Sequence, residues 1–181
     1  MKPMYAVVSL LDQGHYRQVE DLWDELRRHC GVEGVYQTPF PHFSYHVAHG
    51  YNLVTLQASL QRFARNTPPF RVRTAGLGIF TGQHPVVYIP VVRSPELTAL
   101  HEALWPEADA TATRSIDHYH PDLWVPHITV GQGDLCHENL GDVVQLLNQR
   151  SLNWNVTVDN LAVISSSGSA EGLHFKVQLG A

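Results

Sequence analysis

The sequence has little that would anchor the chain in a membrane or cross-link it. Its 181 residues include only two cysteines, Cys30 and Cys136, which are too few for a disulfide framework and lack the spacing of zinc ligands. No apolar run approaches the roughly 20 residues that a membrane-spanning helix needs. Only a short apolar stretch precedes Asp12, which predicts a first strand rather than a signal peptide. We therefore expect a cytoplasmic protein with no membrane partner.

Basic residues are too scarce for a protein that coats nucleic acid. The chain has 12 Lys and Arg residues against 17 Asp and Glu residues, which gives a net charge of −5. Hydrophobic residues make up 44% of the chain and charged residues 16%, so a core can form and disorder of the whole chain is excluded. No low-complexity linker separates two halves. We expect a single domain over residues 1–181, and a monomer.

Hydrophobic periodicity predicts strands and helices in alternation. The expected strands are residues 4–10, 42–48, 70–80, 86–92, 125–131, 154–164 and 173–179. The expected helices are residues 19–30, 53–63, 95–105 with a stop at Pro106, and 138–149. The last two strands are expected to form a hairpin around residues 165–169. This order indicates an α+β or α/β protein in which helices cover sheets.

One short pattern occurs twice along the chain. Residues 40–45 (FPHFSY) and 125–130 (VPHITV) both read apolar, Pro, His, apolar, hydroxyl, apolar. The composition of the chain would give about 0.02 such patterns by chance, and each copy begins a predicted strand. Residues i and i+2 of a strand point to the same face, with a separation of about 6–7 Å. Each copy therefore presents an imidazole and a hydroxyl on one surface.

Two such strands side by side would form an acid–base site. One imidazole can act as general base and the other as general acid on opposite sides of a reacting centre. Two hydroxyls can donate hydrogen bonds to charged oxygens between them. A phosphodiester suits this arrangement. We expect His127 to act as base and His42 as acid, with the symmetry of the pair allowing the two to exchange roles, and Ser44 and Thr129 to bind the phosphate oxygens.

The two motifs, His42-Phe43-Ser44-Tyr45 and His127-Ile128-Thr129-Val130, resemble the paired His-x-Thr/Ser-x signature of the 2H phosphoesterase superfamily. This superfamily includes 2′,3′-cyclic nucleotide phosphodiesterases and 2′-5′ RNA ligase-like proteins. The resemblance extends along essentially the whole chain. It implies an α+β, bilobal fold in which two pseudo-two-fold related halves have antiparallel-rich sheets lining a central cleft, with helices outside.

The resemblance also implies an activity. It implies hydrolysis of a 2′,3′-cyclic phosphate on a nucleotide or RNA end, or action on a 2′-5′ linkage, with no metal and no cofactor. The sequence departs from the family pattern at two positions. Ser44 replaces the commoner threonine but keeps a hydroxyl donor. Gln132 stands where the ligase-like branch often has arginine, which favours hydrolysis over ligation.

Other readings of the same residues stay open at this stage. The 12 histidines could include zinc or iron ligands drawn from His42, His46, His118, His120 and His127. A non-catalytic module that binds an RNA end is a third reading. By strand alternation His46 belongs either at the cleft edge or on the surface. Tyr119 and Trp124 precede the second motif and either stack on a base or belong to the core.

Overall fold

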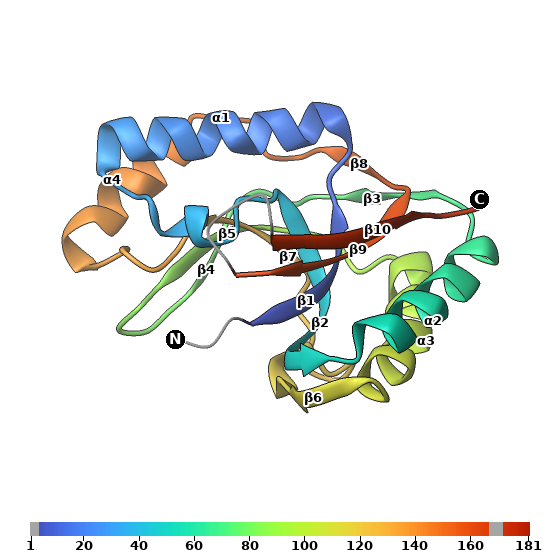
Figure 1. The fold of residues 1–181 in the computed structure, drawn as a ribbon. Coiled ribbons are helices and arrows are strands. Elements are labelled where there is room, and N and C mark those ends of the chain that lie inside the picture. The colour runs from blue at the N-terminus through green and yellow to red at the C-terminus, as the bar shows by residue number, and fades with distance from the viewer. Residues whose placement is uncertain (1–3, 167–171) are drawn as a thin grey trace.

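Two pairs of helices pack against a large antiparallel sheet (Figure 1), and residues of all four helices share one hydrophobic core with it. The computed structural model describes residues 4–166 and 172–181. The helices are α1 (Gln13–Cys30), α2 (Leu53–Arg65), α3 (Pro95–Asp109) and α4 (His137–Leu147), with short 3₁₀ turns η1 (Gly34–Gln37) and η2 (Asp117–Tyr119). Helix α1 lies beside α4, and α2 lies beside α3.

The sheet has the strand order β10-β9-β1-β2-β7-β5-β4, and β6 pairs separately with β2. Its strands are β1 (Tyr5–Leu10), β2 (His42–Tyr51), β4 (Gly78–Phe80), β5 (Val86–Pro90), β6 (Ala112–Ser115), β7 (His127–Gly131), β9 (Asn160–Ser165) and β10 (Leu173–Gln178). A second, two-stranded sheet joins β3 (Phe70–Arg73) to β8 (Asn155–Val158). Every pairing among these strands is antiparallel, which confirms the predicted α+β class.

Helix α1 shows how local sequence sets the elements. The Asp12 carboxylate accepts a hydrogen bond from the His15 backbone N–H and caps the first turn. Gly31, with a φ of 68°, ends the helix in the left-handed conformation that glycine adopts without strain. The residues buried between these ends lie at helical spacing, as predicted: Val19, Leu22, Trp23 and Leu26. Burial of this stripe fixes α1 on the sheet.

Two of the predicted long strands are each divided between the two sheets. The strand expected over residues 70–80 becomes β3, which pairs with β8, and β4, which pairs with β5. Gly76, with a φ of 69°, turns the chain between them. The strand expected over residues 154–164 likewise becomes β8 and β9. The terminal hairpin is therefore β9 with β10 only, and most of its predicted loop lies outside the described residues.

The helix stop predicted at Pro106 is wrong, because α3 continues to Asp109. A proline removes the hydrogen bond to the carbonyl four residues earlier. That carbonyl belongs to Glu102, and both residues lie on the exposed side of the helix, where water can donate the missing hydrogen bond to the carbonyl.

Periodicity also did not predict β6, which is a short strand at the edge of β2. Among the described residues, no helix has the length and apolar character that crossing a bilayer requires.

Candidate active site

The two histidine motifs meet at the centre of the sheet, where β2 and β7 pair. Phe43 lies opposite Ile128, and both side chains belong to the main core on the helix-covered side. Strand alternation turns the motif histidines and hydroxyls to the other face of the sheet. Extending the register by one residue in each direction sets His42 opposite Thr129 and Ser44 opposite His127. These positions put the two histidines on one diagonal of a square, where the backbones of a regular sheet are about 7–8 Å apart, and the two hydroxyl residues on the other diagonal.

The same backbone arrangement orients both imidazole rings. The His42 Nδ1 atom donates to the Phe40 carbonyl, and the His127 Nδ1 atom donates to the Val125 carbonyl at 2.7 Å. A carbonyl only accepts, so each Nδ1 carries a proton, and each neutral ring keeps its lone pair on Nε2. Nε2 is therefore the nitrogen available for proton transfer in both rings.

The proline in each motif accepts a hydrogen bond from the residue that follows a neighbouring strand, β1 or β5. The Pro41 carbonyl accepts a hydrogen bond from the Leu11 backbone N–H at 3.1 Å. The Pro126 carbonyl accepts the matching bond from Val91 at 2.9 Å. These two bonds fix the residue that precedes each histidine. The apolar–Pro–His pattern thus sets where each strand begins and how its ring is held.

Burial makes both imidazoles weak bases. Burial lowers the pKa of His42 to about 4, although its bond to the Phe40 carbonyl favours the charged ring, and positive charge on His127 lowers the pKa further. Burial also lowers the pKa of His127, opposed by its bond to the Val125 carbonyl. Both rings are therefore neutral at neutral pH in the free protein, and His42 holds a proton the more weakly of the two.

Apolar side chains flank the square on both sides. On the β1 side, Leu10 lies opposite His42 and Val8 opposite Ser44. These two belong to a small buried cluster with Phe40, Ala162 and Ile164. Because opposed residues of an antiparallel pair share a face, this cluster forms a dry border beside the first motif. It accounts for the burial of His42.

On the β5 side, two half-buried aromatic rings border the second motif. Tyr88 lies opposite Thr129, and its ring stacks on Phe80 with centroids 4.2 Å apart. The ring centroid of His127 is 5.0 Å from that of Phe80 and 5.2 Å from that of Tyr88. Sequence reasoning missed both residues. The available signal was the alternation of Tyr88 with buried Val87 and Ile89 along β5.

Gly78 lets the Tyr88 ring lie flat across the edge strand. A Cβ atom at this position would come within 2.5 Å of the Tyr88 ring. We expect Gly78→Ala to displace Tyr88 from Phe80 and His127 and to lower the free energy of unfolding by about 1–2 kcal/mol. Urea unfolding and the NMR resonance of the His127 Cε1–H report the two effects.

Gly141→Ala is the matched control for this substitution. Gly141 lies inside α4, and nothing within 4 Å would meet its added Cβ. Alanine there should stabilise the protein by about 0.5–1 kcal/mol, because it favours the helix. An unchanged stability and an unchanged His127 resonance in Gly78→Ala would show that Tyr88 does not depend on the bare backbone of Gly78.

His46 lies neither at the cleft edge nor on the surface. The β1–β2 register places Val7 opposite His46 and Val8 opposite Ser44, so β2 has a bulge at Tyr45. The bulge breaks the side-chain alternation, and His46 is fully buried. Its ring is tilted against that of Trp105, with centroids 4.3 Å apart, and its Nδ1 lies 2.6 Å from the Tyr51 hydroxyl.

The two aromatic residues before the second motif belong to the core. Trp124 is only 2% exposed, and its indole N–H donates to the Ser44 carbonyl at 2.8 Å. Tyr119 is half-buried against the main core cluster. Trp124 therefore has no face free to stack on a base, although it touches the first motif from behind.

The structure does not gather the histidines of the metal alternative. His42 lies on the open face of the sheet, whereas His46 is buried beneath the other face. Within residues 4–166 and 172–181, no group of three or more His, Cys, Asp or Glu side chains is arranged to hold a metal ion.

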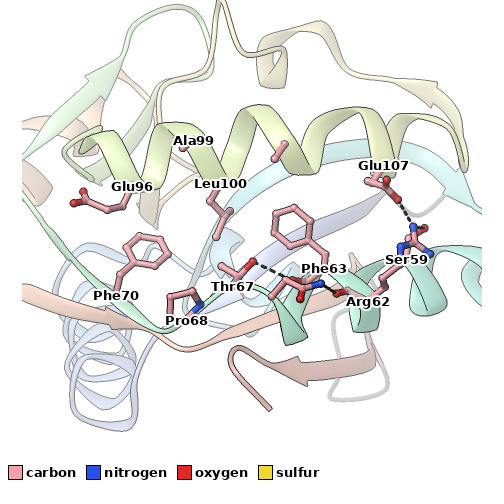
Figure 2. A pocket seen from close by; sticks show the side chains of 12 residues that line it. Ser59, Arg62, Phe63, Thr67, Pro68, Phe70, Glu96, Ala99, Leu100 and Glu107 are labelled. Atoms are coloured by element: carbon pink, nitrogen blue, oxygen red, sulfur yellow. Dashed lines mark hydrogen bonds and ion pairs between the residues drawn. The ribbon is translucent and has the colours of Figure 1, made fainter.

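A cavity of about 590 Å³ lies away from the motifs, between α2 and α3 (Figure 2). Phe63, Phe70 and Leu100 line it, and the ion pair of Arg62 with Glu107, at 2.8 Å, borders it. None of the four motif residues lines this cavity. The candidate active site is therefore the open sheet face at β2 and β7, opposite the face that packs on the main core.

Comparison with known proteins identifies the family of the chain. The sequence model of the 2′-5′ RNA ligase superfamily matches residues 15–170. The chain belongs to this superfamily of 2H phosphoesterases. The resemblance expected from the two motifs is thereby confirmed.

Solved structures of very different sequence share the superfamily fold. TT0787 of Thermus thermophilus has a TM-score of 0.63 at 16% identity, over 98% of each chain. LigT of E. coli, in a crystal structure with 3′-AMP, has a TM-score of 0.50 at 12% identity, over 100% of each chain. Usb1 of Kluyveromyces marxianus has a TM-score of 0.50 at 11% identity, over 98% of this chain and 97% of its own.

Sequence relatives of this superfamily member include proteins from Bacillus. The Bacillus cereus (strain AH820) protein named "Putative phosphoesterase BCAH820_1309" is 27% identical over 112 residues. That alignment covers 62% of this chain and 60% of the relative. A Bacillus thuringiensis (strain Al Hakam) protein with a matching name has the same identity and coverage. The chain thus spans about 60% of the length of the curated relatives that it matches.

Proposed function

We propose that this 2H superfamily member is a metal-independent phosphodiesterase that hydrolyses a 2′,3′-cyclic phosphate on a nucleotide or RNA end. The observation that carries the proposal is the pairing of Phe43 with Ile128, from which strand alternation puts two imidazoles and two hydroxyls on one sheet face. Its two imidazoles present Nε2 from opposite corners, so that one phosphorus atom between them can be flanked by an acid and a base. The hydroxyls stand at the remaining corners, where the non-bridging oxygens would lie.

Hydrolysis then needs two proton transfers. The neutral imidazole takes a proton from a water molecule as the water oxygen bonds to phosphorus. The protonated imidazole donates its Nε2 proton to the ribose oxygen as that oxygen leaves phosphorus. Ser44 and Thr129 donate hydrogen bonds to the phosphate oxygens, which gain charge in the transition state. The product is a phosphate monoester.

The structure favours His42 as base and His127 as acid, which reverses the order expected from sequence. Burial lowers the pKa of His42 to about 4, so this ring is the one that starts neutral. The shift at His127 is downward but smaller, and the negative charge of a bound phosphodiester would favour its charged form. His127 is therefore the better proton donor.

The borders of the square suit a nucleotide. Phe80 and Tyr88 offer an apolar, aromatic surface beside His127. A nucleobase can stack on such aromatic side chains whatever its identity. LigT, which has the same fold, is known in a complex with 3′-AMP. Both observations support a substrate that carries a nucleobase next to the cyclic phosphate.

The test is incubation with the four 2′,3′-cyclic nucleotides and a 2′-5′-linked dinucleotide, followed by phosphorus NMR to assign the product. We expect turnover of at least one cyclic nucleotide, unchanged after exhaustive treatment with a chelator, because imidazoles move the protons and hydroxyls hold the phosphate. Loss of activity on chelation, restored by a transition metal, would support the metal alternative. Turnover of the 2′-5′ dinucleotide alone would identify the ligase-like branch as the correct reading.

Three sequence-based expectations complete the proposal. We propose one domain, because a single eight-stranded sheet contains strands from both halves of the chain. We also propose a monomer and a cytoplasmic location. Size-exclusion chromatography with light scattering tests the first of these two, and cell fractionation tests the second.

A further inference from the structure

Two tryptophans contact the active-site strands at equivalent positions from the buried side. The Trp23 indole N–H donates to the Thr129 carbonyl at 3.1 Å, and the Trp124 indole N–H donates to the Ser44 carbonyl at 2.8 Å. Thr129 and Ser44 occupy the same place in their motifs, two residues after the histidine. Each bond also joins parts of the chain that are distant in sequence, by 106 and 80 residues.

These bonds fall where the pairing of β2 with β7 ends. The register between the two strands consists of one pair, Phe43 with Ile128. A continuous ladder would give the carbonyls on either side of this pair a backbone N–H from the opposite strand. A buried carbonyl without a donor costs free energy, so such groups are nearly always satisfied. The two indoles supply a donor on each side of the single pair.

The indole of Trp124 is itself held firmly. It stacks on the His101 ring, with centroids 3.7 Å apart, and the Arg93 guanidinium lies 5.7 Å from the centre of the Trp124 ring. His101 donates from Nε2 to the Tyr45 carbonyl at 2.9 Å, because a carbonyl can only accept. The indole and its stacking partner therefore bind two successive carbonyls of β2, those of Ser44 and Tyr45.

Trp23 is held in a similar way from the other half of the chain. It is 4% exposed, on the buried stripe of α1. Its ring meets Tyr36 edge-on, with centroids 5.9 Å apart. Each indole is thus a rigid part of the core that ends in one hydrogen bond to an active-site strand.

We propose that Trp23 and Trp124 are positioning residues that set the separation of β2 and β7 and thereby the distance between the two catalytic imidazoles. The expected effect of these residues on kcat rests on the proposed function. A strand pair held by one register position can open or twist about that position. The indole hydrogen bonds on the two sides of this pair prevent the motion. They fix the carbonyls of Thr129 and Ser44, which lie opposite His42 and His127.

The decisive variants remove the donor and keep the shape. Replacement of each tryptophan by 3-benzothienylalanine puts sulfur in place of the indole N–H. We expect kcat for the cyclic nucleotide to fall about 10- to 100-fold in each variant, with KM little changed, because a small misplacement of catalytic groups slows chemistry more than binding. Trp23→Phe and Trp124→Phe should follow the same trend, and the benzothienyl variants keep the test valid where a phenylalanine variant does not fold.

Trp154 provides the matched control. Its indole N–H also donates to a backbone carbonyl, that of Ser151, at 2.9 Å, but neither residue belongs to β2 or β7. The same replacement at Trp154 should leave kcat unchanged. An equal loss of kcat at Trp154 would show that the effect reflects a general loss of stability, and would overturn the proposal.

A second measurement separates this inference from the proposed function. NMR titration of His42 and His127 in the double benzothienyl variant should show shifted resonances and altered apparent pKa values for both rings, with the wild-type pattern in the Trp154 variant. This readout needs no substrate. If the wild type hydrolyses nothing, the proposed function fails, and shifted histidine resonances still support the positioning role. Unchanged resonances together with unchanged kcat in the double variant would overturn it.

Discussion

Replacing either motif histidine with alanine is expected to slow hydrolysis of a cyclic phosphate by about 10²–10⁴-fold. His42 and His127 would serve one step as acid and base, so loss of either one stops the transfer that the other completes. The double variant should be little slower than the single variants, because residues that act as a unit are not additive. Steady-state kinetics with a 2′,3′-cyclic nucleotide measures the rates of the two single variants and the double variant.

The dependence of kcat/KM on pH checks the same mechanism. One ring must be neutral and the other protonated, which predicts a bell-shaped profile. Because burial lowers the pKa of both rings, the acidic limb should lie below the ordinary pKa of histidine. Each single alanine variant should lose one limb of the bell.

The hydroxyl variants give a graded comparison. Ser44→Ala and Thr129→Ala should cost less than either histidine variant, because each removes one hydrogen-bond donor and leaves both proton carriers in place. His49→Ala is the matched control, since His49 is an exposed histidine on the same strand, β2. A His42 or His127 variant with near-normal turnover would rule out the two-histidine mechanism.

The free energy of unfolding is expected to fall by several kcal/mol as the pH is lowered from 7 towards 4. Two histidines outside the active site, His46 and His101, are fully buried. Burial lowers the pKa of each ring to about 4. The Asp109 carboxylate raises the pKa of His46, and the bond to the Tyr45 carbonyl raises that of His101, but burial has the larger effect on both. Unfolded histidine titrates near pH 6.5. Below that pH the unfolded chain binds protons that the native protein excludes, so stability is lost as the pH falls.

Urea unfolding at several pH values measures this loss. Each buried histidine contributes a slope of about 1.4 kcal/mol per pH unit between pH 6.5 and 4. His101→Gln keeps an amide donor for the Tyr45 carbonyl and should reduce the total slope by this amount, as should His46→Gln. His49→Gln, at an exposed position, should leave the slope unchanged. A wild-type stability that stays constant from pH 7 to pH 5 would contradict the prediction.

The sequence by itself determined the features that depend on neighbours along the chain. The stripe from Val19 to Leu26 and the stop at Gly31 predicted α1. The repeated apolar–Pro–His pattern predicted two strands that present histidine and hydroxyl on one face, because alternation in a strand is local. The family followed from that repeat and is confirmed by the superfamily match over residues 15–170.

Only the tertiary structure decided which segments pair and which side chains lie behind them. Residues 70–80 look like one strand, but β3 and β4 join different sheets. His46 has the right spacing for the open face, yet the bulge at Tyr45 turns it into the core. Phe80 and Tyr88 reach His127 through strand pairing, and Trp23 and Trp124 reach Thr129 and Ser44 across 106 and 80 residues. Such contacts depend on register and on the packing of distant segments, which periodicity along the chain does not encode.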